Sequence, residues 1–156
     1  MSGCLAAGLA GAGCATTRPQ PAPQAAALEE LPILWQKSGT YSRISRMTHV
    51  VVRDPQTLAR IPVAEVPVDF ENQMVLIVGL GPTPTNELGV RVGRVWRDGS
   101  QIRVQERRIH PGAEHSPGLD PASPWTIVVV PKSDLNVEGF LTRVPPGTLA
   151  DHPGAR

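Results

Sequence analysis

Apolar runs separated by proline, glycine and polar residues dominate the middle of the chain, and they predict strands rather than helices. The run Met74–Leu80 is apolar throughout, which is typical of a central strand buried on both faces. Trp125–Val130 and the β-branched end of the segment Ile44–Arg53 have the same character. Two shorter strands are expected, at residues 33–37 and 137–141.

A β-hairpin is the strongest local prediction. Asp98-Gly99 lies between two segments of alternating apolar and polar residues, 88–96 and 101–108, and Asp-Gly favours the tight turns that join such strands. The alternation in the first segment shifts after Gly93, which indicates a β-bulge at that residue.

One short helix is expected at residues 54–61. Asp54 is a good N-cap, Pro55 suits the first helical position, and Leu58 and Ile61 lie on one face. The pattern as a whole predicts a mainly β domain, an antiparallel sandwich- or barrel-like sheet with one or two short helices.

Length and composition limit the class of protein. The 156 residues suffice for one domain with terminal extensions, which excludes a multidomain enzyme. The chain holds 17 Pro and 15 Gly, which disfavour long helices. Its net charge of +1 differs from the strongly basic balance of dedicated nucleic-acid binders, so we expect no nucleic-acid partner.

The N-terminus resembles a bacterial lipoprotein signal. Residues 1–13 are small and weakly hydrophobic, fewer than the ~18 apolar residues of a membrane span, and they precede Cys14, the expected site of lipidation. Gly11 stands where such signals have leucine, and no basic residue precedes it. A start codon upstream of Met1, or a plain Ala/Gly leader with two incidental cysteines, therefore stays an alternative.

The remaining boundaries follow from composition. Residues 14–30 are rich in proline and alanine and read as a tether, 31–143 as the folded domain, and 144–156 as a disordered tail. After cleavage before Cys14 the domain would hold no cysteine, which excludes thiol catalysis, thiolate metal sites and disulfides. We expect a lipid-anchored protein of the bacterial cell envelope, facing the periplasm or the surface.

No catalytic, metal or cofactor site is predicted. His110 and His115 flank Glu114, but Pro111-Gly112 prevents helical alignment and no third ligand can be named. Ser116 beside His115 is not a triad, and phosphate-binding glycine motifs are absent from the sequence. The chain is therefore interpreted as a non-enzyme, with an enzyme of unrecognised type as an alternative.

The predicted hairpin carries the one charge anomaly of the sequence. Six arginines stand there against Asp98 and Glu106, and a basic face could bind an acidic partner or lipid headgroups. Arginine also commonly fills the solvent face of a strand and protects its edge. The candidate partner-binding arginines are Arg91, Arg94, Arg103 and Arg107.

An ordered set of landmarks resembles the C-terminal domain of the protease complex subunit PrcB family. The landmarks span Trp35 to Ser133: Trp35 with Ser38-Gly39, Val50 to Asp54, Val68-Asp69-Phe70 before the run 74–81, Pro82-Thr83, the Asp-Gly hairpin, and Ser123-Pro124-Trp125 before Pro131-Lys132. The family's Gly-Tyr after the Pro-Thr loop is absent, and its Pro-Tyr stands here as Pro124-Trp125. The resemblance implies a non-catalytic, secreted or lipid-anchored accessory protein, associated in some members with a cell-surface protease complex.

A second, fainter resemblance concerns two proline-rich loops. Residues 81–86 resemble the N-P-T-T-G-Y loop of chagasin-like cysteine-protease inhibitors, and Pro124-Trp125 resembles their R-P-W loop. Stiff turns without a binding role are an equally simple reading. The candidate partner-binding residues in these loops are Pro82, Thr83, Pro84, Thr85, Pro124 and Trp125.

The expected function is therefore that of a non-catalytic envelope lipoprotein that binds another envelope protein, with a protease as the candidate partner. A protease inhibitor that uses loops 81–86 and 121–125 is the alternative, and a purely structural envelope lipoprotein is a third reading.

Overall fold

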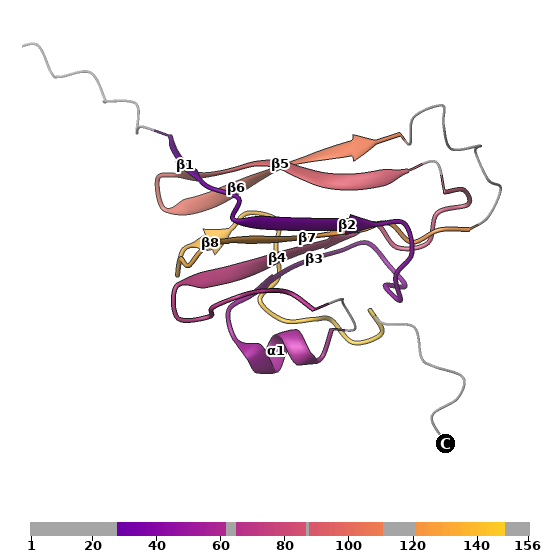
Figure 1. The fold of residues 1–156 in the computed structure, drawn as a ribbon, viewed down its shortest axis with the longest axis horizontal. Coiled ribbons are helices and arrows are strands. Elements are labelled where there is room, and N and C mark those ends of the chain that lie inside the picture. Colours follow the sequence, from indigo (N-terminus) through magenta and orange to yellow (C-terminus); the bar gives the residue numbers. More distant parts are fainter. Residues whose placement is uncertain (1–27, 62–64, 87, 111–120, 149–156) are drawn as a thin grey trace, which may run out of the picture.

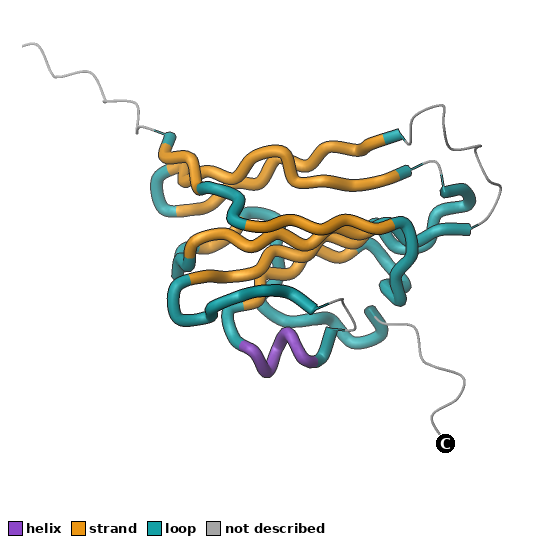
Figure 2. Tube along the Cα trace, viewed as in Figure 1, coloured by secondary structure: helices purple, strands orange, loops and turns teal. Residues whose placement is uncertain are grey.

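The computed structural model describes residues 28–61, 65–86, 88–110 and 121–148. Two four-stranded sheets stack face to face, and one short helix, α1 (Pro55–Ala59), lies beneath them (Figures 1 and 2). The prediction of a mainly β domain is confirmed, and the two sheets form a sandwich.

The first sheet, here called the hairpin sheet, has the order β1 (Glu29–Leu31), β5 (Gly89–Asp98), β6 (Gln101–Ile109) and β8 (Asn136–Val137). The second, here called the central sheet, has the order β2 (Trp35–Gly39), β7 (Trp125–Pro131), β4 (Gln73–Gly79) and β3 (Thr48–Val52).

Strands β4 and β7 of the central sheet are buried on both faces, which explains their continuous apolar runs. Along β4, Met74, Leu76 and Val78 pack against the hairpin sheet in one core. The alternate residues Val75 and Ile77 pack on the opposite side in a second core. Leu58 of α1 and the segment 66–70 cover that second core, so the sheet is the middle layer of three.

Helix α1 forms where the sequence predicts it. The Asp54 side chain accepts hydrogen bonds from the backbone N–H of Thr57 (2.7 Å) and from its hydroxyl (2.8 Å), as an N-cap does. The same bonds hold the pKa of Asp54 below its usual value, because they favour the charged carboxylate. Ile61 follows the helix and packs into the second core.

The hairpin and its bulge are also confirmed. Strands β5 and β6 pair antiparallel and are joined by the two residues Gly99 and Ser100, with Gly99 at φ +61°. The register shifts between Val92 and Arg94, so Gly93 is the bulged residue. The strands extend through Asp98 and Ile109, slightly beyond the expected limits.

Four details correct the expected elements. Strand β1 begins inside the expected tether, because Glu29 and Glu30 already pair with β5. The strand expected at 44–53 begins only at Thr48, since the preceding serines bond to other loops. The strand expected at 137–141 is reduced to Asn136–Val137, which pairs parallel with β6. Part of the expected tail is ordered, because the backbone N–H of Ser45 donates to the carbonyl of Thr148 (2.7 Å).

Different turns, strands and loops form the two ends of the sandwich (Figure 1). At the turn end lie the Gly99-Ser100 turn, β1, β8 and the loop after β7. At the loop end lie residues 40–47, 80–86, 88 and 121–124, because β2 and β4 finish there and β3, β5 and β7 start there. The described chain begins beside β1, at the turn end.

Candidate partner-binding surface

The structure brings the two proline-rich loops together at the loop end. The backbone N–H of Thr83 donates to the carbonyl of Ala122 (2.7 Å), and Ala122 donates back to Thr83 (3.0 Å). A third bond runs from the N–H of Leu80 to the carbonyl of Pro124 (2.9 Å). The two loops therefore form one hydrogen-bonded unit, although 39 residues separate Thr83 from Ala122.

Backbone geometry holds loop 81–86 against the rest of the loop end. Gly81 has φ +72°, and a Cβ at this position would lie 2.8 Å from the Cα of Arg46. Only glycine fits such a conformation at such a close approach. The Thr83 hydroxyl donates to the carbonyl of Thr85 (2.8 Å), and the rings of Pro82 and Pro84 stay exposed.

Pro124 and Trp125 have a structural position rather than an exposed one. Pro124 is buried, and the indole N–H of Trp125 donates to the carbonyl of Tyr41 (2.7 Å). The Trp125 ring lies over Gly39, where a Cβ would come within 2.7 Å of it. Trp125 therefore holds the segment after β2 in place.

Two exposed apolar side chains at the loop end were not predicted from the sequence as binding residues. Tyr41 is 62% exposed and Met47 is 58% exposed. Both belong to the segment 40–47, where they stand among serines and arginines and show no strand or helix periodicity. The available signal was their residue type, because tyrosine, methionine and arginine are enriched at protein interfaces.

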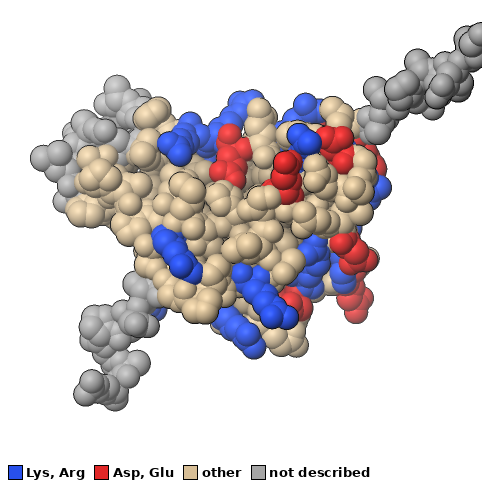
Figure 3. All heavy atoms as spheres, turned by 180° about the vertical axis from the view of Figure 1, so that it is seen from behind, with Lys and Arg blue, Asp and Glu red and all other residues tan. Residues whose placement is uncertain are grey.

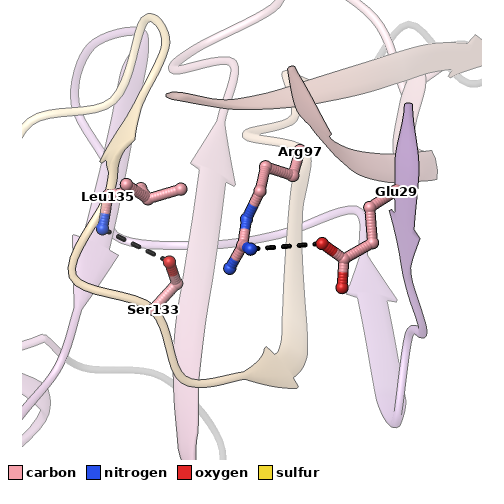
Figure 4. A network of polar contacts seen from close by, with 4 residues as sticks. All are labelled: Glu29, Arg97, Ser133 and Leu135. Carbon is pink, nitrogen blue, oxygen red and sulfur yellow. Dashed lines mark hydrogen bonds and ion pairs between the residues drawn. The ribbon is translucent and has the colours of Figure 1, made fainter. Parts of the chain in front are cut away.

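The candidate arginines fall into two groups. At the turn end Arg94 pairs with Glu30 (3.3 Å), and Arg103 pairs with Asp98 (2.9 Å) and Glu138 (3.2 Å). Figure 4 shows a further pair, Arg97 with Glu29 of β1 (3.1 Å), beside the bonded Ser133 and Leu135 of the loop after β7. Figure 3 shows acidic side chains among the basic ones on the surface seen from behind.

Towards the loop end the pattern is different. Arg91 and Arg107 lie directly opposite each other in the β5–β6 register, and both are exposed. Within the described part of the chain neither has an acidic partner. The Arg107 side chain lies over Gly93, where an added Cβ would be 2.9 Å from its Nε.

A small cleft opens beside these residues. It has a volume of about 210 Å³ and lies between the end of β2 and the start of β5. Leu88, Val90 and Ile109 supply its apolar lining, and Arg91 stands at the same place.

The other chemical groups of the sequence are distributed as follows. His49 of β3 bonds to Glu106 of β6 (Nε2 to Oε1, 2.8 Å) and thereby links the two sheets. Cys14, Glu114, His115 and Ser116 lie outside the described residues. Over the described ranges, no three histidine, cysteine or acidic side chains gather as a metal site would need. No helix in these ranges has the length and apolarity to cross a membrane.

Comparison with known proteins gave no match: no family model, no curated protein and no solved structure is similar to this chain. The resemblances to the PrcB family and to chagasin-like inhibitors therefore stay predictions.

Proposed function

We propose that this chain is a non-catalytic domain that binds another protein of the bacterial cell envelope through its loop end. The observation that carries the proposal is the pairing of the two proline-rich loops by the Thr83–Ala122 bonds, next to exposed Tyr41 and Met47. A surface held rigid before binding loses little conformational entropy when a partner docks.

The chemistry of the surface supports the same function. Tyrosine, methionine and arginine are over-represented at protein interfaces. The loop end offers exposed Tyr41 and Met47, and the part of the β5–β6 hairpin towards it carries exposed Arg91 and Arg107. The exposed proline rings of the paired loops extend this surface.

The place where the described chain enters the domain supports the proposal of a lipid anchor at Cys14. The described chain starts at the turn end, next to β1. A tether attached there would leave the loop end directed away from the membrane. The binding surface would then be free to meet a partner in the envelope.

Crosslinked affinity capture from the native envelope tests this proposal. The full chain is compared with the variant Tyr41→Ser plus Met47→Ser, and with Leu34→Ser as a matched control. Leu34 is 49% exposed and lies before β2, away from the loop end. We expect one dominant protein with the wild type and the control, and at least tenfold less of it with the double variant. Equal recovery by all three proteins would contradict the proposal.

Inhibition of a protease is the alternative function, and the paired loops are the observation that favours it. A hydrogen-bonded unit of two stiff loops can act as a rigid wedge in a protease cleft. Its test is inhibition of a papain-like cysteine protease by the full chain. Pro82→Ala plus Thr83→Ala should abolish inhibition while circular dichroism shows a folded domain, because the backbone bonds between Thr83 and Ala122 do not depend on these side chains. Unchanged inhibition by this variant would remove the loop from the mechanism.

A further inference from the structure

Among the residues that the structure describes, strand β5 has a free edge over more than half of its length. Strand β1 covers it only from Val95 to Arg97, and then Pro32 leads the chain away towards β2 in the other sheet. From Gly89 to Arg94 none of the described residues pairs on that edge. Two hollows flank it: the cleft of about 210 Å³ beside Gly89–Arg91, and one of about 410 Å³ beside Gly93–Val95.

Strand β1 shows what chemistry this edge accepts. Glu30 bonds to Arg94 and Glu29 bonds to Arg97, so each carboxylate meets an arginine of β5. The next residue, Leu31, is buried between the sheets in the main core. The segment that already occupies part of the edge is therefore acidic and apolar. Its carboxylates bond to arginines of β5, and its leucine packs in the core.

The part of the edge that no described residue covers offers the same combination of arginine and apolar side chains. Arg91 and Arg107 face each other across β5 and β6 with no acidic partner in the described ranges. Like charges directly opposite each other in a sheet are destabilising, so an arriving carboxylate would relieve an unfavourable contact. The apolar lining of the smaller cleft, Leu88 and Ile109 included, lies next to these arginines.

We propose that an extended acidic and apolar segment of the partner protein adds to the free edge of β5 in line with β1. Its backbone pairs with Gly89–Arg94, a carboxylate binds Arg91 and Arg107, and an apolar side chain enters the cleft between β2 and β5. Main-chain bonds supply affinity in this mode of recognition, and alternate side chains supply specificity. This inference rests on the proposed partner-binding function and specifies the chemistry of the partner.

The test uses the full chain and a fluorescent nine-residue peptide of alternating glutamate and leucine, measured by anisotropy at low salt. One control peptide carries lysine in place of glutamate, and another is N-methylated on its backbone at alternate residues. The edge variant is Arg91→Glu plus Arg107→Glu. Its matched control, Arg60→Glu plus Arg143→Glu, makes the same charge change at two exposed arginines near α1 and the C-terminal segment. Circular dichroism verifies that both variants are folded.

We expect saturable binding of the glutamate peptide to the wild type, at least tenfold weaker binding to the edge variant, and a change below twofold in the control. N-methylation should weaken binding at least tenfold, and the lysine peptide should bind only the edge variant. Absence of binding to the wild type, equal binding to the edge variant, or indifference to N-methylation would each overturn the inference. A wild-type dimer that the edge variant dissociates would also overturn it, because a second copy would then be the occupant.

The peptide test and the capture test can fail independently. The variant Tyr41→Ser plus Met47→Ser should retain peptide binding, because both substitutions lie outside the free edge. Failure of the peptide with intact capture through Tyr41 and Met47 would overturn the edge inference alone. Peptide binding without such capture would overturn only the role of the loop end.

Discussion

The two ends of the sandwich differ in whether their arginines are paired with carboxylates. At the turn end Arg94, Arg97 and Arg103 each have a carboxylate within 3.3 Å. Towards the loop end Arg91 and Arg107 face each other without one among the described residues. The difference shows that the described residues pair each of these turn-end arginines with a carboxylate and leave Arg91 and Arg107 without one.

The apolar side chains of the two ends also differ, in how far they are exposed. At the turn end Leu31 enters the core between the sheets, and so attaches β1 to the rest of the domain. At the loop end Tyr41 and Met47 remain more than half exposed. Tyrosine and methionine are enriched at protein interfaces, so these two side chains form the apolar part of the binding surface that we propose.

The largest loss of stability is expected from truncating a buried side chain at the turn end. Leu31→Ala removes the only β1 side chain that is buried, and we expect a loss of about 2–5 kcal/mol in the free energy of unfolding. Urea denaturation measures this loss. A change below about 0.5 kcal/mol, the size of an ordinary surface substitution, would mean that β1 is not part of the cooperative fold.

A smaller loss is expected from strain at the loop end. Gly81→Ala places a Cβ 2.8 Å from the Arg46 backbone at φ +72°, and we expect a cost of about 1–3 kcal/mol. Gly99→Ala is the matched control, because it shares a positive φ but has no atom within 4 Å of an added Cβ. Thermal unfolding should show the larger drop for position 81, and equal drops would rule out the close approach.

Charge reversal should change stability with opposite signs at the two ends. Arg103→Glu removes the pairs with Asp98 and Glu138, and we expect it to destabilise the domain by about 0.5–1 kcal/mol. Arg107→Glu places a carboxylate opposite Arg91 and should stabilise the free domain by about 0.2–1 kcal/mol. Urea denaturation at low salt compares the two, and a common sign would refute the division of the arginines.

The smallest effect concerns one exposed ion pair. Glu30→Gln removes the carboxylate that bonds to Arg94, and both side chains are about half exposed. We expect a loss of roughly 0.2–1 kcal/mol, which should disappear in 1 M salt. A loss that persists in high salt would assign the effect to packing of β1 rather than to charge.

The main strands and the hairpin could be predicted because their signals are local. The run 74–80 is apolar because β4 has a core on each face, and Asp98-Gly99 favours the observed turn. Strand β1 could not be predicted in this way. Glu29–Leu31 is three residues long, and it becomes a strand only by pairing with β5, more than 60 residues later in the chain.

The candidate site was predictable in its residue types and not in its arrangement. The proline-rich loops and the arginines stood out in the sequence, but the division of the arginines depends on distant carboxylates such as Glu30 and Glu138. Pro124 is buried and Trp125 bonds to Tyr41, so their place in the fold depends on segments far apart in the chain. Tyr41 and Met47 were missed because their exposure follows from the tertiary fold.

The most direct test of the account is site-specific photocrosslinking in the native envelope from the two ends of the domain. A photoreactive amino acid replaces Met47 at the loop end in one sample and Leu34, before β2, in another; both side chains are about half exposed. We expect position 47 to yield a discrete crosslinked complex with one envelope protein and position 34 to yield none. The same complex from position 34, without one from position 47, would contradict the assignment of the loop end as the binding surface.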